Sequence, residues 1–239
     1  MARKNEAERL LKDGLYPSLI AKEMGISAST VIQYLRTQVG EGSLRLSDLF
    51  FSWSPEKREI LQQAVNANYQ DRNLLLVENE LCPEELYLFI KLRNRRTFAG
   101  DMYEYVSETE IIIHELVSNI LQREFGTDES CWWRKGIPVK IRKKCASLRE
   151  EDEEPCGFPY AYTSLIDLAT IILKKWALFK NNVPARYTSN RKQLESDFAR
   201  LNRIRNAVMH PVKERNWTEE DFEFVREVFG LFKEIDASK

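Results

Sequence analysis

Apolar residues recur at three- and four-residue steps along nearly the whole chain, and this spacing is the strongest constraint on its fold. It is the pattern of the buried face of an amphipathic helix. Only nine of the 239 residues are glycine, and most of these stand where the periodic segments break. A hydrophobic content of 43% is sufficient for a substantial core. We therefore expect an all-α protein.

The first 53 residues have a pattern of their own. Helices are expected over residues 6–13, 18–24 and 28–38, with Pro17 in the first turn of the second. The sharp turn Gly25-Ile26-Ser27 separates the last two helices. Ala21 is small enough for the helices to cross closely, and Val31 seals the pair. The spacing predicts a helix-turn-helix domain over residues 1–53.

In such a domain the third helix enters the major groove of DNA. The side chains expected at the DNA are Ser27, Ser29, Thr30, Gln33 and Arg36. Residues 44–51 are expected to add a short strand or wing. However, seven Lys and Arg against six Asp and Glu leave residues 1–53 with a charge of only +1, which provides little counterion-release affinity. Docking of a protein is therefore the alternative role for this domain.

The rest of the chain divides near residue 100. Residues 54–100 are expected to form a helical connector, with helices opening at Pro55 and Pro83. Residues 101–239 are expected to form an antiparallel helical bundle. Its helices include one that ends at Gly126 and starts at Ser107 or Asp101, and a basic one from Val139 to about Arg149. A further apolar face runs from Leu165 to Phe179, and Thr218 caps the last helix.

One late helix combines arginine with one of only two histidines in the chain. Leu194, Phe198, Leu201, Ile204 and Val208 mark its buried face, whereas Arg203, Asn206 and His210 form a polar stripe. Pro211 should end the helix at His210. Histidine can exchange a proton near neutral pH, and arginine presents a planar fork suited to phosphate. These are groups that cleavage of an RNA backbone requires.

The segment Arg205-Asn206-Ala207-Val208-Met209-His210, in the late helix of an all-α bundle, resembles the motif of the HEPN superfamily. The resemblance covers roughly residues 101–239. It implies a helical bundle, commonly dimeric, and a metal-independent ribonuclease of a toxin–antitoxin, abortive-infection or RNA-processing system. Arg205, Asn206 and His210 match the motif and would be catalytic. Arg203 also lies within the tolerated spacing, so either arginine fits.

A second candidate feature combines aromatic and basic residues. Aromatic rings beside a basic run can stack bases and hold a phosphate backbone. The alternative is that both tryptophans belong to the core. His114, between Ile113 and Leu116, is expected to be a packed helical histidine. The candidate RNA-binding residues are Trp132, Trp133, Arg134, Lys135, Lys140, Arg142, Lys143 and Lys144.

Other classes of function find little support in the composition. The formal net charge is −1, so nucleic acid would have to bind a local patch. The four cysteines, Cys82, Cys131, Cys145 and Cys156, suggest neither a zinc site nor a disulfide framework. We expect no cofactor or metal. We find no signal peptide or membrane span and expect a cytoplasmic protein.

The sequence thus favours a dimeric, metal-independent endoribonuclease of the HEPN type in a toxin–antitoxin or defence context. Its N-terminal helix-turn-helix would dock DNA or a partner, such as an antitoxin or regulatory protein. The alternative is a non-catalytic DNA-binding transcriptional regulator whose bundle provides dimerisation and senses a nucleotide or partner.

Overall fold

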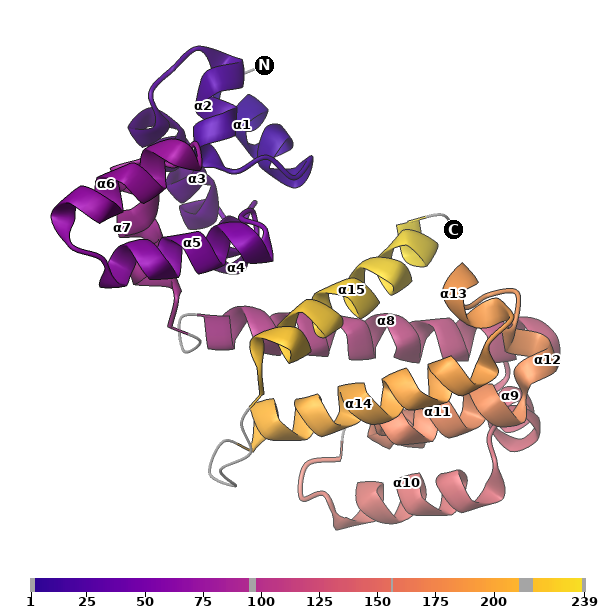
Figure 1. The fold of residues 1–239 in the computed structure, drawn as a ribbon. Coiled ribbons are helices and arrows are strands. Elements are labelled where there is room, and N and C mark those ends of the chain that lie inside the picture. The colour runs from indigo at the N-terminus through magenta and orange to yellow at the C-terminus, as the bar shows by residue number, and fades with distance from the viewer. Residues whose placement is uncertain (1–2, 95–97, 156, 211–216, 238–239) are drawn as a thin grey trace. The chain divides into compact units, whose positions relative to one another are not determined.

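The computed structural model describes residues 3–94, 98–155, 157–210 and 217–237, and every regular element in these ranges is a helix (Figure 1). The prediction of an all-α protein is confirmed. The chain forms two compact units, Met1–Asp101 and Met102–Lys239. Each is described by itself.

Up to residue 94, the described part of the first unit contains the helices α1 (Arg3–Lys12), α2 (Pro17–Met24), α3 (Ala28–Gly40), α4 (Leu46–Phe50), α5 (Pro55–Asn66), α6 (Tyr69–Glu78) and α7 (Pro83–Leu92). The predicted turn between α2 and α3 is present. Gly25 has a φ of 62°, in the left-handed region that favours glycine. The backbone N–H of Ile26 donates to the carbonyl of Ala21 at 3.0 Å and closes α2. Ser27 then caps α3 by accepting the Thr30 N–H at 3.2 Å.

The expected strand or wing over residues 44–51 is wrong, because this segment contains the short helix α4. Two features of the structure favour a helix. The Asp48 carboxylate accepts the Arg45 N–H at 2.8 Å, which stabilises a helix start. The adjacent residues Leu49 and Phe50 are both buried, whereas a half-exposed strand would bury alternate residues.

Residues 54–100, expected as a connector, lie in the same compact unit as residues 1–53. Helix α7 packs against α3, α4 and α5. At its first turn the fully buried Glu85 accepts the backbone N–H groups of Ser18 and Cys82 at 3.1 and 3.0 Å. It also accepts the Ser18 hydroxyl and, at 3.2 Å, the indole N–H of Trp53. One carboxylate therefore joins three distant segments of the unit.

The second unit is a helical bundle with short connecting helices (Figure 1). Its long helices are α8 (Ala99–Phe125), α10 (Val139–Glu151), α11 (Leu165–Lys174), α14 (Arg191–Met209) and α15 (Glu219–Ala237), and its short ones are α9 (Glu129–Gly136), η2 (Pro159–Tyr162), α12 (Trp176–Phe179) and α13 (Ala185–Thr188). Helix α11 packs against α14. The Tyr105 ring of α8 contacts the Phe222 and Phe229 rings of α15.

Two predicted boundaries in this unit need correction. Helix α8 begins at Ala99, two residues before the alternative start at Asp101, so the Ser107 capping sequence lies inside it rather than at its start. The reason is that buried Met102, Tyr105 and Val106 extend the helical pattern ahead of Ser107. The expected face from Leu165 to Phe179 is divided between α11 and α12, since Lys175 leaves helical geometry at φ −106° and ψ 30°.

Candidate functional site

The polar stripe of the arginine–histidine helix lies on the surface of α14. Leu194, Phe198, Leu201 and Ile204 are buried as predicted, but Val208 is only half-buried and Ala207 completes the buried face. Arg203 and His210 are exposed, and Asn206 is half-exposed. The second histidine of the chain, His114, lies on α8.

His210 marks the end of α14, as predicted. Its backbone N–H donates to the Asn206 carbonyl at 3.2 Å, and its φ of −129° and ψ of 64° leave the helix. Pro211, which predicted this ending, is outside the described residues. The exposed imidazole therefore follows the last helical turn of α14.

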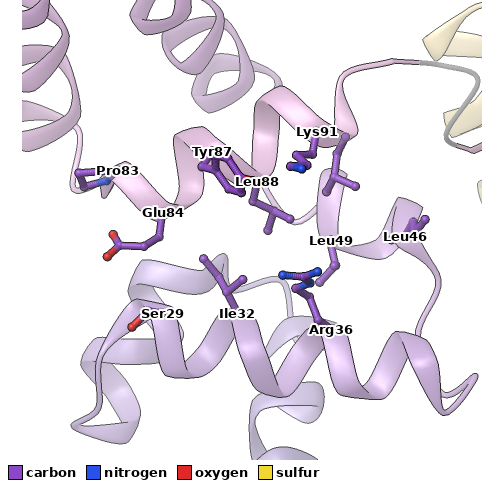
Figure 2. A pocket seen from close by; sticks show the side chains of 11 residues that line it. Ser29, Ile32, Arg36, Leu46, Leu49, Pro83, Glu84, Tyr87, Leu88 and Lys91 are labelled. Atoms are coloured by element: carbon purple, nitrogen blue, oxygen red, sulfur yellow. The ribbon is translucent and has the colours of Figure 1, made fainter.

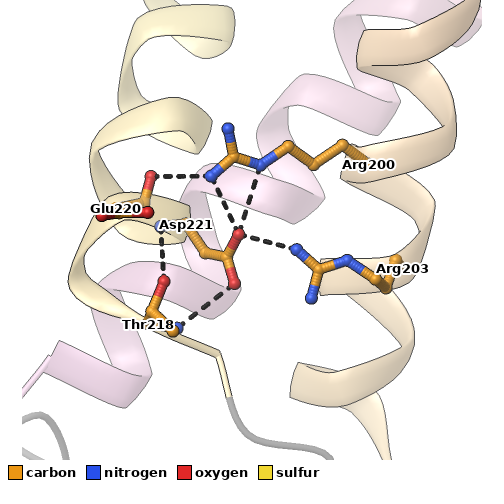
Figure 3. Close-up of polar contacts among 5 residues, drawn as sticks. All are labelled: Arg200, Arg203, Thr218, Glu220 and Asp221. Carbon is orange, nitrogen blue, oxygen red and sulfur yellow. Dashed lines mark hydrogen bonds and ion pairs between the residues drawn. The ribbon is translucent and has the colours of Figure 1, made fainter.

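Arg203 binds a carboxylate from the first turn of α15 (Figure 3). Its guanidinium donates to Asp221 at 2.8 Å, and Arg200 donates to the same oxygen at 3.0 and 3.2 Å. The other oxygen of Asp221 accepts the Thr218 N–H, while Thr218 Oγ1 accepts the Asp221 N–H, both at 3.2 Å. This is the predicted cap of the last helix. Arg200 and Arg203 thus share one carboxylate oxygen.

Burial and hydrogen bonding have opposite effects on the pKa of the Asp221 carboxyl. Burial acts to raise its pKa, since only 4% of the side chain is exposed. Hydrogen bonds from Arg200, from the Thr218 backbone and from Arg203 outweigh burial, and the pKa lies below its usual value. Asp221 is therefore charged at neutral pH and holds the Arg203 guanidinium at the surface.

Arg205 points instead to α8. Its Nε donates to the Glu110 carboxylate at 3.1 Å, and the two side chains are 30% and 21% exposed. By contrast, 54% of the Arg203 side chain is exposed. Seven residues correspond to nearly two full helical turns, so Arg203 lies within about 20° of His210 around the axis, whereas Arg205 lies about 140° away. Within one chain, Arg203 is the arginine that shares a face with the histidine.

The aromatic residues of α9 belong to a cluster along α8. Trp132 is 4% exposed, and its ring lies 5.1 Å from that of Tyr160. A buried ring is not available to stack a base, so the prediction that Trp132 binds RNA is wrong, because its indole serves the core. Trp133 is half-exposed and contacts the Phe158 ring.

His114 packs into the same cluster. Its Nε2 lies 3.2 Å from the Tyr160 carbonyl, and the Tyr160 hydroxyl donates to the His114 carbonyl at 2.8 Å. The two rings are 4.1 Å apart. These contacts agree with a packed histidine. His114 is one helical turn beyond Glu110, so the cluster and the Arg205 contact occupy neighbouring positions on one face of α8.

Some basic residues of α9 and α10 are held by acceptors within the protein, and others are exposed. Lys144 binds the Asp167 carboxylate at 2.5 Å, and the Nε of Arg142 donates to the Ile137 carbonyl at 3.1 Å. The side chains left as exposed cations are Arg134, Lys135, Lys140 and Lys143.

On α3, the residues expected at DNA lie mostly at the surface. Ser27, Ser29, Gln33 and Arg36 are exposed, and Thr30 is half-exposed. The Ser27 hydroxyl is already engaged, since it lies 3.0 Å from Ser29 Oγ and 2.8 Å from Thr30 Oγ1. It serves primarily as the cap of α3.

Cys82, Cys131 and Cys145 are free thiols, and Cys156 lies outside the described residues. Burial, followed by the nearby carboxylates Glu85 and Asp167 respectively, raises the pKa values of Cys82 and Cys145 to about 11, so both thiols are neutral at physiological pH. No group of three or more His, Cys, Asp or Glu in the described ranges is placed to hold a metal ion. Within the same ranges, no helix combines the length and apolarity needed to cross a bilayer.

Sequence reasoning missed Glu110 and Asp221, the two carboxylates that hold the arginines. Glu110 is separated from Arg205 by 95 positions, and no local pattern connects them. Asp221 carried a signal as the fourth residue of the Thr218 capping box, but a cap does not reveal which arginine it will bind. No protein-family model, curated protein or solved structure matches this chain.

Proposed function

We propose that this protein is a metal-independent endoribonuclease of the HEPN type that acts as a homodimer. The observation that carries the proposal is the surface stripe on α14, in which an exposed imidazole at the helix end shares a face with an exposed guanidinium. The half-exposed Asn206 lies between them. The resemblance of residues 205–210 to the family motif gives this stripe its chemical interpretation.

In the proposed reaction, the 2′-hydroxyl of one nucleotide attacks the adjacent phosphorus. A base removes the 2′ proton, the bond to the 5′ oxygen breaks, and an acid protonates that leaving oxygen. The products are a 2′,3′-cyclic phosphate and a 5′-hydroxyl. His210 moves the proton, Asn206 orients the reacting groups, and an arginine stabilises the charge that develops on the phosphate. A two-fold dimer supplies a second imidazole, so that base and acid are both present.

We propose different roles for the two arginines on the basis of the geometry of α14. The motif names Arg205, but its side chain is turned toward Glu110 and lies well around the helix from His210. We assign the phosphate contact to Arg203, and we assign Arg205 the role of a positioning residue that fixes the end of α14 on α8. The assignment rests on side-chain exposure and helical angle.

The dimer requires a contact surface, and α8 offers a candidate. Tyr103 and Ile111 are large apolar side chains that are 51% and 53% exposed. They are eight residues apart on one face of α8, and Ile111 adjoins Glu110. A second copy that covers them would form its interface next to the Arg205 contact.

Cleavage assays on defined single-stranded RNA in EDTA test the proposal. His210→Ala should abolish cleavage without changing the oligomeric state; cleavage retained by the folded variant would refute the role of His210. Arg203→Ala should slow cleavage, while Arg200, which still binds Asp221, preserves most of the stability of that contact. Arg205→Ala should lower stability and cleavage together, and Arg205→Lys, which can still pair with Glu110, should restore both. If instead Arg205→Ala slowed cleavage without loss of stability, and Arg203→Ala lowered stability and cleavage together, the phosphate contact would be assigned to Arg205.

The second candidate is a non-catalytic transcriptional regulator with a helix-turn-helix formed by α2 and α3. The observation that favours it is that Arg203 and Arg205 already bind carboxylates. We propose that the first unit docks DNA or a partner in either case. A regulator should protect a specific operator and tolerate loss of His210, whereas a nuclease should arrest growth when it is overproduced.

A further inference from the structure

A pocket of about 640 Å³ opens between α3 and α7 in the first unit, and the proposed RNA chemistry does not use it (Figure 2). Its volume falls within the range of small-molecule sites, roughly 300–1,000 Å³. All of its lining residues belong to one compact unit. It is therefore a feature of the first unit by itself.

The floor and walls of this pocket are apolar. Leu49, Leu88 and Leu92 are buried beneath it, and Ile32 and Leu46 are half-buried at its sides. Hydrocarbon placed against these five side chains would be removed from water, which favours binding. The pocket therefore suits a ligand with a substantial apolar body.

Charge is distributed unevenly along the pocket. Arg36 and Lys91 lie at one end, whereas Glu84 lies at the other, near Ser29 (Figure 2). In the described part of the chain, neither Arg36 nor Lys91 forms an ion pair; Lys91 Nζ lies 5.0 Å from the centroid of the Tyr87 ring. Seven residues separate Glu84 from Lys91 on α7, a rise of about 10 Å. One end thus attracts an anion, and the other repels it.

We infer that this pocket binds a small amphiphile with a single anionic head, namely a medium-chain monocarboxylate. The carboxylate lies between Arg36 and Lys91, and the alkyl chain covers the leucine floor toward Glu84. Arginine and lysine both donate to carboxylate oxygens, and arginine can do so with two parallel bonds. A second carboxylate at the far end of the chain would meet Glu84, so the pocket selects monoanions over dianions of the same length.

Titration calorimetry on the full chain tests this inference with three probes: decanoate, decanol and the dicarboxylate decanedioate. Decanoate should bind more tightly than either of the others. Arg36→Gln and Lys91→Gln should each weaken decanoate binding by about threefold, the size of an exposed charge contact. Arg93→Gln, an exposed arginine at the end of α7 outside the pocket, should leave binding unchanged. Glu84→Gln should improve binding of decanedioate.

Several outcomes would contradict a carboxylate site in this pocket. Absence of decanoate binding overturns the inference, as does equal binding of decanoate and decanol. A loss in Arg93→Gln equal to that in Arg36→Gln would indicate general attraction to positive charge rather than a site. Circular dichroism of each variant verifies the fold, and the gain expected for Glu84→Gln cannot be produced by partial unfolding.

Discussion

Replacement of Glu85 by alanine offers the most direct test of the first unit's architecture. The carboxylate accepts hydrogen bonds from the backbones of Ser18 and Cys82, from the Ser18 hydroxyl and from the Trp53 indole. Glu85 and Trp53 are both fully buried, so the indole N–H would lose its acceptor in a buried site, whereas Ser18 and Cys82 are half-buried. At about 1 kcal/mol net for each bond, Glu85→Ala should lower the free energy of unfolding by about 4 kcal/mol.

For a unit of this size, each kcal/mol corresponds to a shift in Tm of roughly 4–8 °C, so a fall of at least about 15 °C is expected. Calorimetry of the full chain would measure it. Hydrogen exchange followed by mass spectrometry would locate the change, because amides of α2 and α7 should lose protection while those of α14 keep it. Glu85→Gln, which retains one acceptor oxygen, should fall between the wild type and Glu85→Ala.

The matched control is Glu84→Ala, since the neighbouring side chain is exposed and makes none of these four bonds. If Glu84→Ala and Glu85→Ala unfold at the same temperature, the carboxylate does not join the segments, and the reasoning is wrong. Loss of protection confined to α7 would likewise contradict the predicted effect on α2.

Three further predictions concern the second unit. Asp221→Asn should lower the free energy of unfolding at pH 7 by on the order of 2 kcal/mol. Because the pKa of Asp221 in the folded protein is depressed, this contribution is present above the ordinary pKa of 3.8 and is lost as pH falls through the folded pKa. The free energies of unfolding of wild type and variant, measured by urea titration, should therefore converge in acid. Charge reversal of Lys140 and Lys143 together should weaken RNA binding and reduce its salt dependence, as measured by fluorescence anisotropy, with Lys22→Glu as the control. Unchanged binding would mean that α10 does not contact RNA. Ile111→Lys should convert the proposed dimer to a monomer in light scattering and lower cleavage, whereas Ile90→Lys, at an exposed residue of the first unit, should do neither. A dimer that survives Ile111→Lys would place the interface elsewhere.

Helix starts were the most predictable features of the fold, because they depend on neighbouring residues. Pro17, Pro55 and Pro83 each stand at the first turn of a helix, and Gly25 ends one with positive φ. The segment of α4 misled prediction because its leucines fit a strand as well as a helix. Its burial against α7 is a tertiary effect.

The candidate site was predictable only in part, for a similar reason. The periodicity of α14 correctly placed Arg203, Asn206 and His210 in one exposed stripe. It could not reveal that Arg205 contacts Glu110, since that pair is formed by packing between distant helices. Likewise, a tryptophan beside basic residues looks the same in sequence whether its ring is exposed or, like Trp132, buried.

The position of Arg36 has a thermodynamic consequence. This guanidinium lines the pocket of the first unit, and it is also among the groups proposed to face DNA. If Arg36 pairs with the carboxylate of a pocket ligand, less of its charge is available to DNA phosphates. Binding of the ligand would then weaken binding of DNA. Such coupling is reciprocal: the factor by which the amphiphile lowers the affinity for nucleic acid equals the factor by which nucleic acid lowers the affinity for the amphiphile. Abundance of a metabolite could then set when this unit releases its target.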